Sequence, residues 1–182
     1  MPRIYLVRHG KAAASFTDDL DPGLDALGRT QAEMAASTLI NNTPLNLVSS
    51  PLRRARETAE PLAARLNQKV LIEERIAEIP SPGLDLAERG AWLQNIMKGR
   101  VSDFTPELTD WRQQMIDCLL EIQEDTVIFS HFVAINLLVG AAEDREEVLV
   151  FRPDNGSITV FESNTRHLRL VERGSEAGTR IN

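Results

Sequence analysis

Short apolar runs alternate along the chain with longer stretches in which apolar residues recur every three or four positions. The short runs are typical of strands buried on both faces of a sheet, and the longer stretches are typical of helices that cover such a sheet. Strands are expected at 4–7, 45–49, 70–72 and 126–129. Helices are expected at 27–39, 51–66, 86–97, 108–122 and 134–139.

Two later runs, Ser157–Glu162 and His167–Val171, alternate apolar and polar residues as exposed edge strands do. Together the elements predict an α/β fold, a three-layer α/β/α sandwich whose sheet is mostly parallel with an antiparallel edge strand. Residues 1–172 are expected to form one domain, in which the Pro- and Gly-containing stretch 80–106 makes a short variable cover. Residues 173–182 are expected to be a loose C-terminal tail.

Charge and length narrow the possible partners and the location. The net charge is -7 over 182 residues and the pI is near 5.0, so the chain repels nucleic acid and anionic membranes, and neither is expected as a partner. No apolar run has the length of a signal peptide or a membrane span, so a cytoplasmic protein is expected. The single cysteine, Cys118, lies in an amphipathic stretch and is expected to be a buried, inert thiol. The oligomeric state is left open.

Polar residues follow three of the expected parallel strands. Arg8-His9-Gly10 follows the first strand, Ser49–Arg54 the second and Ser130-His131 the fourth. Open α/β sheets bind ligands at the carboxyl ends of their strands, so two of the three histidines fall where a ligand site is expected. The third, His167, lies in a polar alternating run, and a solvated strand face explains it.

The second helix carries cations where a helix usually carries acids. Ser50 and Pro51 are expected to be its N-cap and first residue, which puts Arg53 and Arg54 in the first turn. The helix dipole disfavours cations there, so their presence indicates a bound anion. Arg53 or Arg56 is nevertheless expected to face solvent or to pair with a nearby glutamate.

In this order and spacing, the motifs resemble the histidine phosphatase superfamily, the group that includes the phosphoglycerate mutases. The matching residues are Arg8-His9-Gly10, then Ser50-Pro51-Leu52-Arg53-Arg54-Ala55 with Thr58, then Ser130-His131. Weaker matches are Leu27-Gly28 with Gln31-Ala32, Glu78, and Asn155-Gly156-Ser157-Ile158. The resemblance implies a phosphatase that works through a phosphohistidine intermediate and needs neither metal nor cofactor.

The resemblance also implies a role for each matching residue. His9 would be the nucleophile, and Arg8, Arg54 and His131 would hold the phosphoryl oxygens. Glu78 would be the general acid, with Asp18 or Asp19 as the alternative. The residues expected to contact substrate are Arg8, Arg54, His131, Lys11 and Ser130.

Two residues depart from the family pattern. Phe132 follows the second histidine where glycine is common, and its ring is expected to narrow the site or to reposition His131. Lys11 stands where the mutase branch usually carries glutamate. It adds positive charge at the mouth of the site and argues against that branch.

The sequence leaves the substrate open between a phosphorylated small molecule and a phosphoprotein that carries phosphohistidine. A mutase is less favoured than a phosphatase, because the 80–106 cover looks too short to exclude water. A binding module without catalysis is a further alternative, but such a module is expected to lose His9 or the acid first. A structural or scaffold protein would explain none of the residues at the strand ends.

Overall fold

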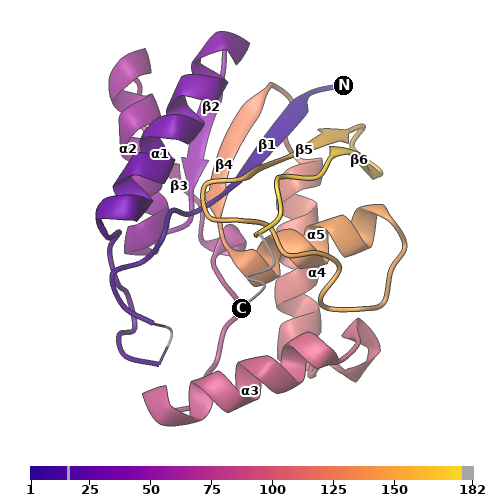
Figure 1. Cartoon of the computed structure of the whole chain (residues 1–182). Helices are drawn as coiled ribbons and strands as arrows, with labels where there is room; N and C mark the ends of the chain where they lie inside the picture. The colour runs from indigo at the N-terminus through magenta and orange to yellow at the C-terminus, as the bar shows by residue number, and fades with distance from the viewer. Residues whose placement is uncertain (16, 178–182) are drawn as a thin grey trace.

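The computed structural model describes residues 1–15 and 17–177, and within them six strands form one sheet in the order β3-β2-β4-β1-β5-β6 (Figure 1). The strands are β1 (Arg3–Arg8), β2 (Asn46–Ser49), β3 (Leu71–Ile72), β4 (Thr126–Ser130), β5 (Ile158–Ser163) and β6 (Leu168–Glu172). The helices are α1 (Ala26–Leu39), α2 (Arg53–Leu66), α3 (Leu86–Lys98), α4 (Pro106–Leu120) and α5 (Phe132–Ala142). Three short 3-10 turns are η1 (Ile40–Asn42), η2 (Glu74–Ile76) and η3 (Val101–Asp103).

The parallel part of the sheet brings the predicted strand ends together. β4 lies between β1 and β2 and pairs in parallel with both, with Arg8 opposite Ser130 and Ser49 opposite Phe129. β3 also runs parallel to β2, whereas β5 and β6 are antiparallel to their neighbours. The polar residues that follow β1, β2 and β4 therefore meet at one edge of the sheet.

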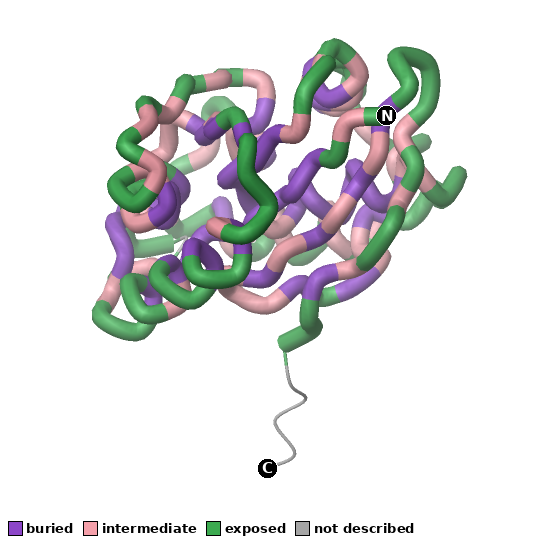
Figure 2. The backbone as a smooth tube through the Cα atoms, turned by 90° about the horizontal axis from the view of Figure 1, so that it is seen from above, coloured by how far each residue is buried: buried purple, intermediate pink, exposed green. Residues whose placement is uncertain are grey.

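Each face of the sheet is covered by helices, which confirms the α/β/α sandwich. Successive side chains of a strand point to opposite faces. Ile4 and Leu6 accordingly pack in one core with α4 and α5, and Tyr5 and Val7 pack in another with α1 and α2. Figure 1 shows these helix pairs on the two sides of the sheet, and Figure 2 shows the buried strands enclosed by more exposed segments.

Helix α1 packs directly on the loop that follows β1. A Cβ placed on Gly28 would lie 2.2 Å from the carbonyl oxygen of Lys11, and one placed on Gly10 would lie 2.3 Å from the carbonyl oxygen of Gly28. Real side chains do not approach backbone atoms so closely. The two glycines therefore allow α1 and this loop to touch backbone to backbone.

The C-terminal part of the sheet differs from the prediction in two ways. β5 is an interior strand, because β1 pairs with one side of it and β6 with the other, so the expectation that both final strands are exposed at an edge is wrong for β5. Its alternating pattern arises because every second residue, such as Phe161, is buried in a core. The histidine at the start of the predicted last strand, His167, lies before β6 and is exposed.

The chain after β6 is held to the rest of the fold as far as Ala177. The backbone N–H of Gly174 donates to Thr159 Oγ1, and that of Ala177 donates to the carbonyl oxygen of Arg152. The expectation of a loose tail is therefore wrong for residues 173–177, because backbone hydrogen bonds hold them, while residues 178–182 lie outside the described residues. Within the part of the chain that the structure describes, every helix is too short or too polar to cross a membrane.

The one cysteine is buried, as expected from the sequence. Cys118 lies on α4 within the larger core, and burial, with a further contribution from Glu73, raises the pKa of its thiol to about 12. A thiol with so high a pKa carries almost no thiolate at neutral pH. Cys118 is accordingly a structural residue.

Candidate active site

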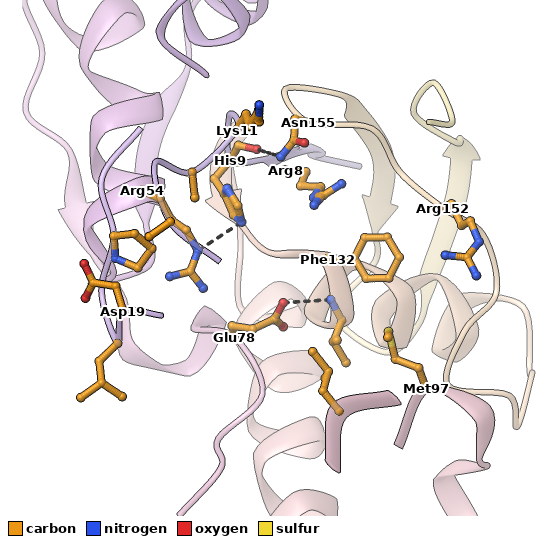
Figure 3. Close-up of a pocket in the computed structure, with 16 residues that line it drawn as sticks. Arg8, His9, Lys11, Asp19, Arg54, Glu78, Met97, Phe132, Arg152 and Asn155 are labelled. Carbon is orange, nitrogen blue, oxygen red and sulfur yellow. Dashed lines mark hydrogen bonds between the residues drawn. The ribbon is translucent and has the colours of Figure 1, made fainter. Parts of the chain in front are cut away.

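A cavity of about 350 Å³ opens at the carboxyl ends of β1 and β4 (Figure 3). Its lining combines four cationic side chains, two carboxylates, a histidine and a set of apolar groups. The lining residues are Arg8, His9, Lys11, Ala12, Ala14, Asp19, Leu20, Pro22, Arg54, Glu78, Leu93, Met97, Phe132, Val133, Arg152 and Asn155. Every residue expected to act in catalysis lines this cavity except His131.

The hydrogen bonds of His9 define which ring nitrogen carries the proton. Nδ1 lies 2.7 Å from the carbonyl oxygen of Gly10, and Nε2 lies 3.2 Å from Nε of Arg54. A guanidinium group can only donate, so Nε2 must be the unprotonated nitrogen and Nδ1 must donate to Gly10. Burial, reinforced by the positive charges of Arg54 and Arg8, lowers the pKa of His9 to about 3. At neutral pH the ring is therefore uncharged, with a lone pair on Nε2.

The loop that carries His9 is tied to two other parts of the chain. Thr58 Oγ1 accepts a hydrogen bond from the Gly10 N–H at 3.0 Å and donates to the carbonyl oxygen of Arg54 at 2.7 Å. Asn155 Nδ2 donates to the carbonyl oxygen of His9 at 3.0 Å. The loop is thus held between helix α2 and the turn before β5.

Arg8 is held from two directions and partly buried. Its Nη1 donates to the carbonyl oxygen of Pro153 at 2.8 Å, and its guanidinium lies 5.0 Å from the centre of the Phe132 ring, within cation–π range. Burial lowers the pKa of Arg8, against the opposing effect of Glu78 and Asp154. Phe132, one of the two residues that depart from the family pattern, thus forms a wall of the cavity and supports Arg8.

Helix α2 begins two residues later than the sequence predicts. Its N-cap is Leu52, whose N–H donates to Ser50 Oγ, and the same Ser50 hydroxyl lies 2.8 Å from Nε2 of His131. Ser50 therefore joins the N-terminus of the helix to His131 instead of capping a helix that starts at Pro51. The buried Arg54 occupies the first turn, and burial lowers the pKa of its guanidinium.

The anion expected at the first turn of α2 is a carboxylate of the chain itself. An oxygen of the Asp21 carboxylate, from the loop after β1, accepts a hydrogen bond from the Arg53 N–H at 2.7 Å. The Arg53 side chain pairs with Glu57 at 2.8 Å, as predicted for one of these arginines. Of the cations near this turn, only Arg54 lines the cavity.

His131 and Ser130 lie beside the cavity rather than on its wall. The His131 ring is completely buried, with its centre 5.3 Å from the centre of the His9 ring, and burial lowers its pKa well below the usual value. Its Nδ1 has no hydrogen-bond partner within the described residues. The Ser130 hydroxyl donates to the carbonyl oxygen of Ile76, which places it in the interior instead of the substrate contact that the sequence predicts.

Glu78 points into the cavity from the segment after η2. Its Oε1 accepts hydrogen bonds from the backbone N–H groups of Ile79 and Ala134, and its Oε2 accepts one from Val133. Two of these donors belong to the first turn of α5, where a carboxylate is favoured by the helix dipole. The carboxyl group therefore has a fixed position below His9 and Arg54 (Figure 3).

The remaining predicted residues divide between the rim and the surface. Lys11 lines the rim, more than half exposed, with its Nζ 3.3 Å from the Asp25 carboxylate. Asp19 lines the cavity on the side away from Arg152, whereas Asp18 is exposed and accepts a hydrogen bond from Ser15. No group of three or more His, Cys, Asp or Glu side chains with the geometry of a metal site occurs among the described residues.

Sequence reasoning missed several of the lining residues. Leu93 and Met97 come from α3, so the expected cover contributes an apolar wall to the cavity. Asn155 belongs to one of the weaker motif matches, and its Asn-Gly step was the signal that could have identified it. Arg152 lies in an irregular segment and carried no sequence signal.

These contacts place a neutral, buried histidine between two arginines at the end of β1. The family model described as histidine phosphatase superfamily (branch 1) matches residues 4–175. The chain belongs to this superfamily. Solved structures agree with this assignment at the level of the fold.

Two solved structures similar to this member of the histidine phosphatase superfamily are a phosphoserine phosphatase from Entamoeba histolytica and a mycobacterial glucosyl-3-phosphoglycerate phosphatase complexed with VO3. The first has a TM-score of 0.77 at 22% identity and covers 96% of this chain and 98% of its own. The second has a TM-score of 0.76 at 24% identity and covers 97% and 100%.

Sequence relatives within the superfamily align over shorter lengths. A glucosyl-3-phosphoglycerate phosphatase of Mycolicibacterium vanbaalenii is 42% identical over 80 residues, which is 42% of this chain and 36% of the relative. A probable phosphoglycerate mutase of Erwinia tasmaniensis is 27% identical over 158 residues, 76% of this chain and 74% of the relative. The first of these matches thus spans about a third of the relative's length.

Proposed function

We propose that this chain is a metal-independent phosphatase that hydrolyses small phosphomonoesters through a phosphohistidine on Nε2 of His9. The observation that carries the proposal is the state of that nitrogen: it is unprotonated, faces a cavity and lies between the buried Arg54 and the partly buried Arg8. A neutral imidazole nitrogen is a competent nucleophile at neutral pH without a separate base. The names of the similar phosphatases support the same reaction class.

In the first step, Nε2 attacks phosphorus in line with the leaving oxygen. The N–P bond forms as the P–O bond breaks, while Arg8 and Arg54 neutralise charge on the equatorial oxygens. The Nδ1 proton stays on the ring, and its hydrogen bond to the Gly10 carbonyl oxygen stabilises the positive charge that the phosphorylated ring acquires. His131 lies outside the cavity lining, with its ring centre 5.3 Å from that of His9 and its Nε2 beside Ser50 Oγ, so no direct contact with the phosphoryl group is assigned to it.

Glu78 is the proposed proton donor to the leaving oxygen. Its Oε1 already accepts two backbone hydrogen bonds and its Oε2 accepts one, so Oε2 has the freer lone pair for a proton. In the second step the same carboxylate takes a proton from water, whose oxygen attacks phosphorus and breaks the N–P bond. The products are the alcohol, inorganic phosphate and the regenerated enzyme.

The cavity volume of about 350 Å³ favours a small phosphorylated molecule over a phosphoprotein. Mutase activity is the second candidate, because several relatives carry the name of probable phosphoglycerate mutase. Incubation with 3-phosphoglycerate separates the two activities. Release of inorganic phosphate marks a phosphatase, and accumulation of 2-phosphoglycerate marks a mutase.

The proposed mechanism is tested by hydrolysis of p-nitrophenyl phosphate in excess EDTA. We expect wild-type activity to persist, His9→Ala to abolish it, and Glu78→Gln to lower kcat by 10²-fold or more, in the range of general acid–base catalysis. His167→Ala and Glu74→Gln are matched controls, because both side chains are exposed and lie outside the cavity. Wild-type turnover that survives in His9→Ala would refute the phosphohistidine route.

The covalent intermediate can be detected directly. p-Nitrophenolate leaves with little need of protonation, so with this substrate Glu78→Gln should slow the second step more than the first. Quenching the variant during turnover is therefore expected to trap about one phosphoryl group per chain. The adduct should be stable in alkali and labile in acid, as an N–P bond is. Absence of this adduct from Glu78→Gln and wild type alike would argue for direct attack by water.

A further inference from the structure

Four cations line the cavity, and three of them already have a role: Arg8 and Arg54 are the proposed ligands of the phosphoryl group, and Lys11 pairs with Asp25 at the rim. The guanidinium of Arg152 makes no hydrogen bond or ion pair with any residue in the described ranges. A cation that lines a cavity without an internal partner is available for an anionic group of the ligand.

The backbone on both sides of Arg152 is fixed, so its position is built into the fold. Asn136 Oδ1 accepts hydrogen bonds from the N–H groups of Val150 and Phe151 at 2.8 and 3.0 Å. The carbonyl oxygen of Arg152 itself accepts from Ala177 N–H at 2.9 Å, and the next residue, Pro153, accepts from Arg8. Arg152 is therefore an exposed side chain on a well-anchored segment.

The place of Arg152 in the cavity separates it from the phosphoryl site. Arg8 and Arg54 are close to His9, whereas Arg152 lies beyond Phe132 and above Met97 (Figure 3). When the phosphoryl group is held at His9, the rest of the substrate would lie along the apolar wall of Phe132 and Met97 and extend toward Arg152. Asp19 lies on the opposite side of the cavity and repels an anion from there.

We propose that Arg152 determines specificity by binding a carboxylate on the leaving group of the substrate. The inference rests on the proposed phosphatase function. A guanidinium binds a carboxylate through two parallel hydrogen bonds, and one uncommitted guanidinium balances one negative charge. A second phosphate carries more negative charge than this single cation balances. The preferred substrates are accordingly phosphomonoesters of small hydroxy acids.

The test compares two substrates that differ at one group. 3-Phosphoglycerate carries a carboxylate where glycerol 3-phosphate carries CH2OH. We expect wild type to prefer 3-phosphoglycerate in kcat/KM, and Arg152→Gln to reduce that preference about tenfold or more, the effect of one charge-assisted contact. The fall in kcat/KM should be much larger for 3-phosphoglycerate than for p-nitrophenyl phosphate, which carries no carboxylate.

Two further variants distinguish specific recognition from a general effect of charge. Arg152→Lys keeps the charge without the two-pronged geometry, so its preference should lie between those of wild type and Arg152→Gln. Arg166→Gln removes an exposed arginine from the turn between β5 and β6, outside the cavity, and should leave the preference intact. An equal fall in Arg152→Gln and Arg166→Gln would overturn the proposal.

Binding to a chain without the nucleophile keeps this test independent of catalysis. Calorimetric titration of His9→Ala should show tighter binding of 3-phosphoglycerate than of glycerol 3-phosphate, and His9→Ala with Arg152→Gln should bind the two alike. If wild type hydrolyses neither ester, the proposed function fails while the titration still decides the role of Arg152. A preference that is absent from His9→Ala, or that survives in the double variant, would overturn the role of Arg152.

Discussion

One hydroxyl group, that of Thr58, joins the loop of His9 to the helix of Arg54. It is fully buried, accepts from Gly10 and donates to the carbonyl oxygen of Arg54. The proposed nucleophile, His9, and the arginine that contacts it thus depend on a common anchor. A shift of His9 would therefore also shift Arg54, and the reverse. Such shifts matter because phosphoryl transfer depends mainly on the accurate position of the groups around the phosphate.

Replacing Thr58 by valine tests this anchor. The change keeps the shape of the side chain but leaves the Gly10 N–H buried without an acceptor, which costs about 1–3 kcal/mol of stability. We expect a lower melting temperature and a lower kcat on p-nitrophenyl phosphate. Thr30→Val, which removes an exposed hydroxyl on α1, should change neither. A Thr58→Val protein with full activity would show that the loop keeps its position without this bond.

Single residues also show how far the sequence predicts the site. Arg8, His9, Arg54 and Glu78 were identified because strand ends and motif spacing place them, and all four line the cavity. Ser130 does not line the cavity, although it stands in a matching motif. Its hydroxyl bonds to the carbonyl oxygen of Ile76, in a 3-10 turn 54 residues away, and no local pattern reveals that contact.

At the scale of elements, the contact between α1 and the loop after β1 fixes the position of the loop that carries His9. Gly28 and Gly10 have no room for a Cβ, because each would meet backbone atoms of the other segment. A larger residue can be accommodated only if α1 moves away from the loop. Such a movement would also loosen the loop that carries His9.

Gly28→Ala is the corresponding prediction. Overpacking at a site that cannot relax costs about 1–3 kcal/mol, and this one meets backbone, so we expect destabilisation together with reduced kcat. Gly140→Ala is the matched control, since it lies inside α5 with its nearest neighbour 3.5 Å from the added Cβ, and alanine favours helix. Thermal melts compare the stability of the two variants, and steady-state rates compare their kcat. Equal stability of both would contradict the close contact.

Strong periodicity in the sequence predicts the helices and strands correctly. The prediction fails where contacts with distant residues determine where an element starts or whether a strand lies at the edge of the sheet. The apolar runs of β1 and β4 predict buried central strands, and the structure has them side by side. The start of α2 was misjudged because Ser50 bonds to His131, a partner 81 residues away. β5 was misjudged because an alternating pattern is the same for an edge strand and for an interior strand with one covered face.

At the scale of the whole molecule, the buried histidines link stability to pH. In an unfolded chain a histidine takes up a proton below about pH 6.5, whereas folded His9 stays neutral down to about pH 3. The pKa of His131 is lowered in the same direction. As pH falls below 6.5 the unfolded chain binds protons that the folded chain does not, so the free energy of unfolding decreases, and above 6.5 these groups have no effect.

His9→Asn should make the protein less sensitive to acid. Each such histidine contributes a slope of about 1.4 kcal/mol per pH unit, so between pH 6 and pH 4 the variant should lose stability less steeply than wild type by about this amount. Urea denaturation at several pH values measures the free energy of unfolding of both proteins. The carboxylates are the same in both, so their contribution cancels in the difference between wild type and His9→Asn. The ring of His167 is exposed, and His167→Asn serves as the control. Parallel curves for wild type and His9→Asn would mean that folded His9 does accept a proton in this range.

The hydrogen bond from Asn155 to the carbonyl oxygen of His9 spans 146 residues of sequence, and that from Arg8 to Pro153 spans 145. His9, the proposed nucleophile, is therefore synthesised well before the residues that hold its loop and its neighbouring arginine. A nascent or truncated chain that stops before Pro153 carries His9, Arg54 and Glu78 without these supports. The proposed phosphatase activity would accordingly appear only after synthesis has passed Asn155, and two fragments cut in the exposed 143–147 segment would regain it only by reassembling.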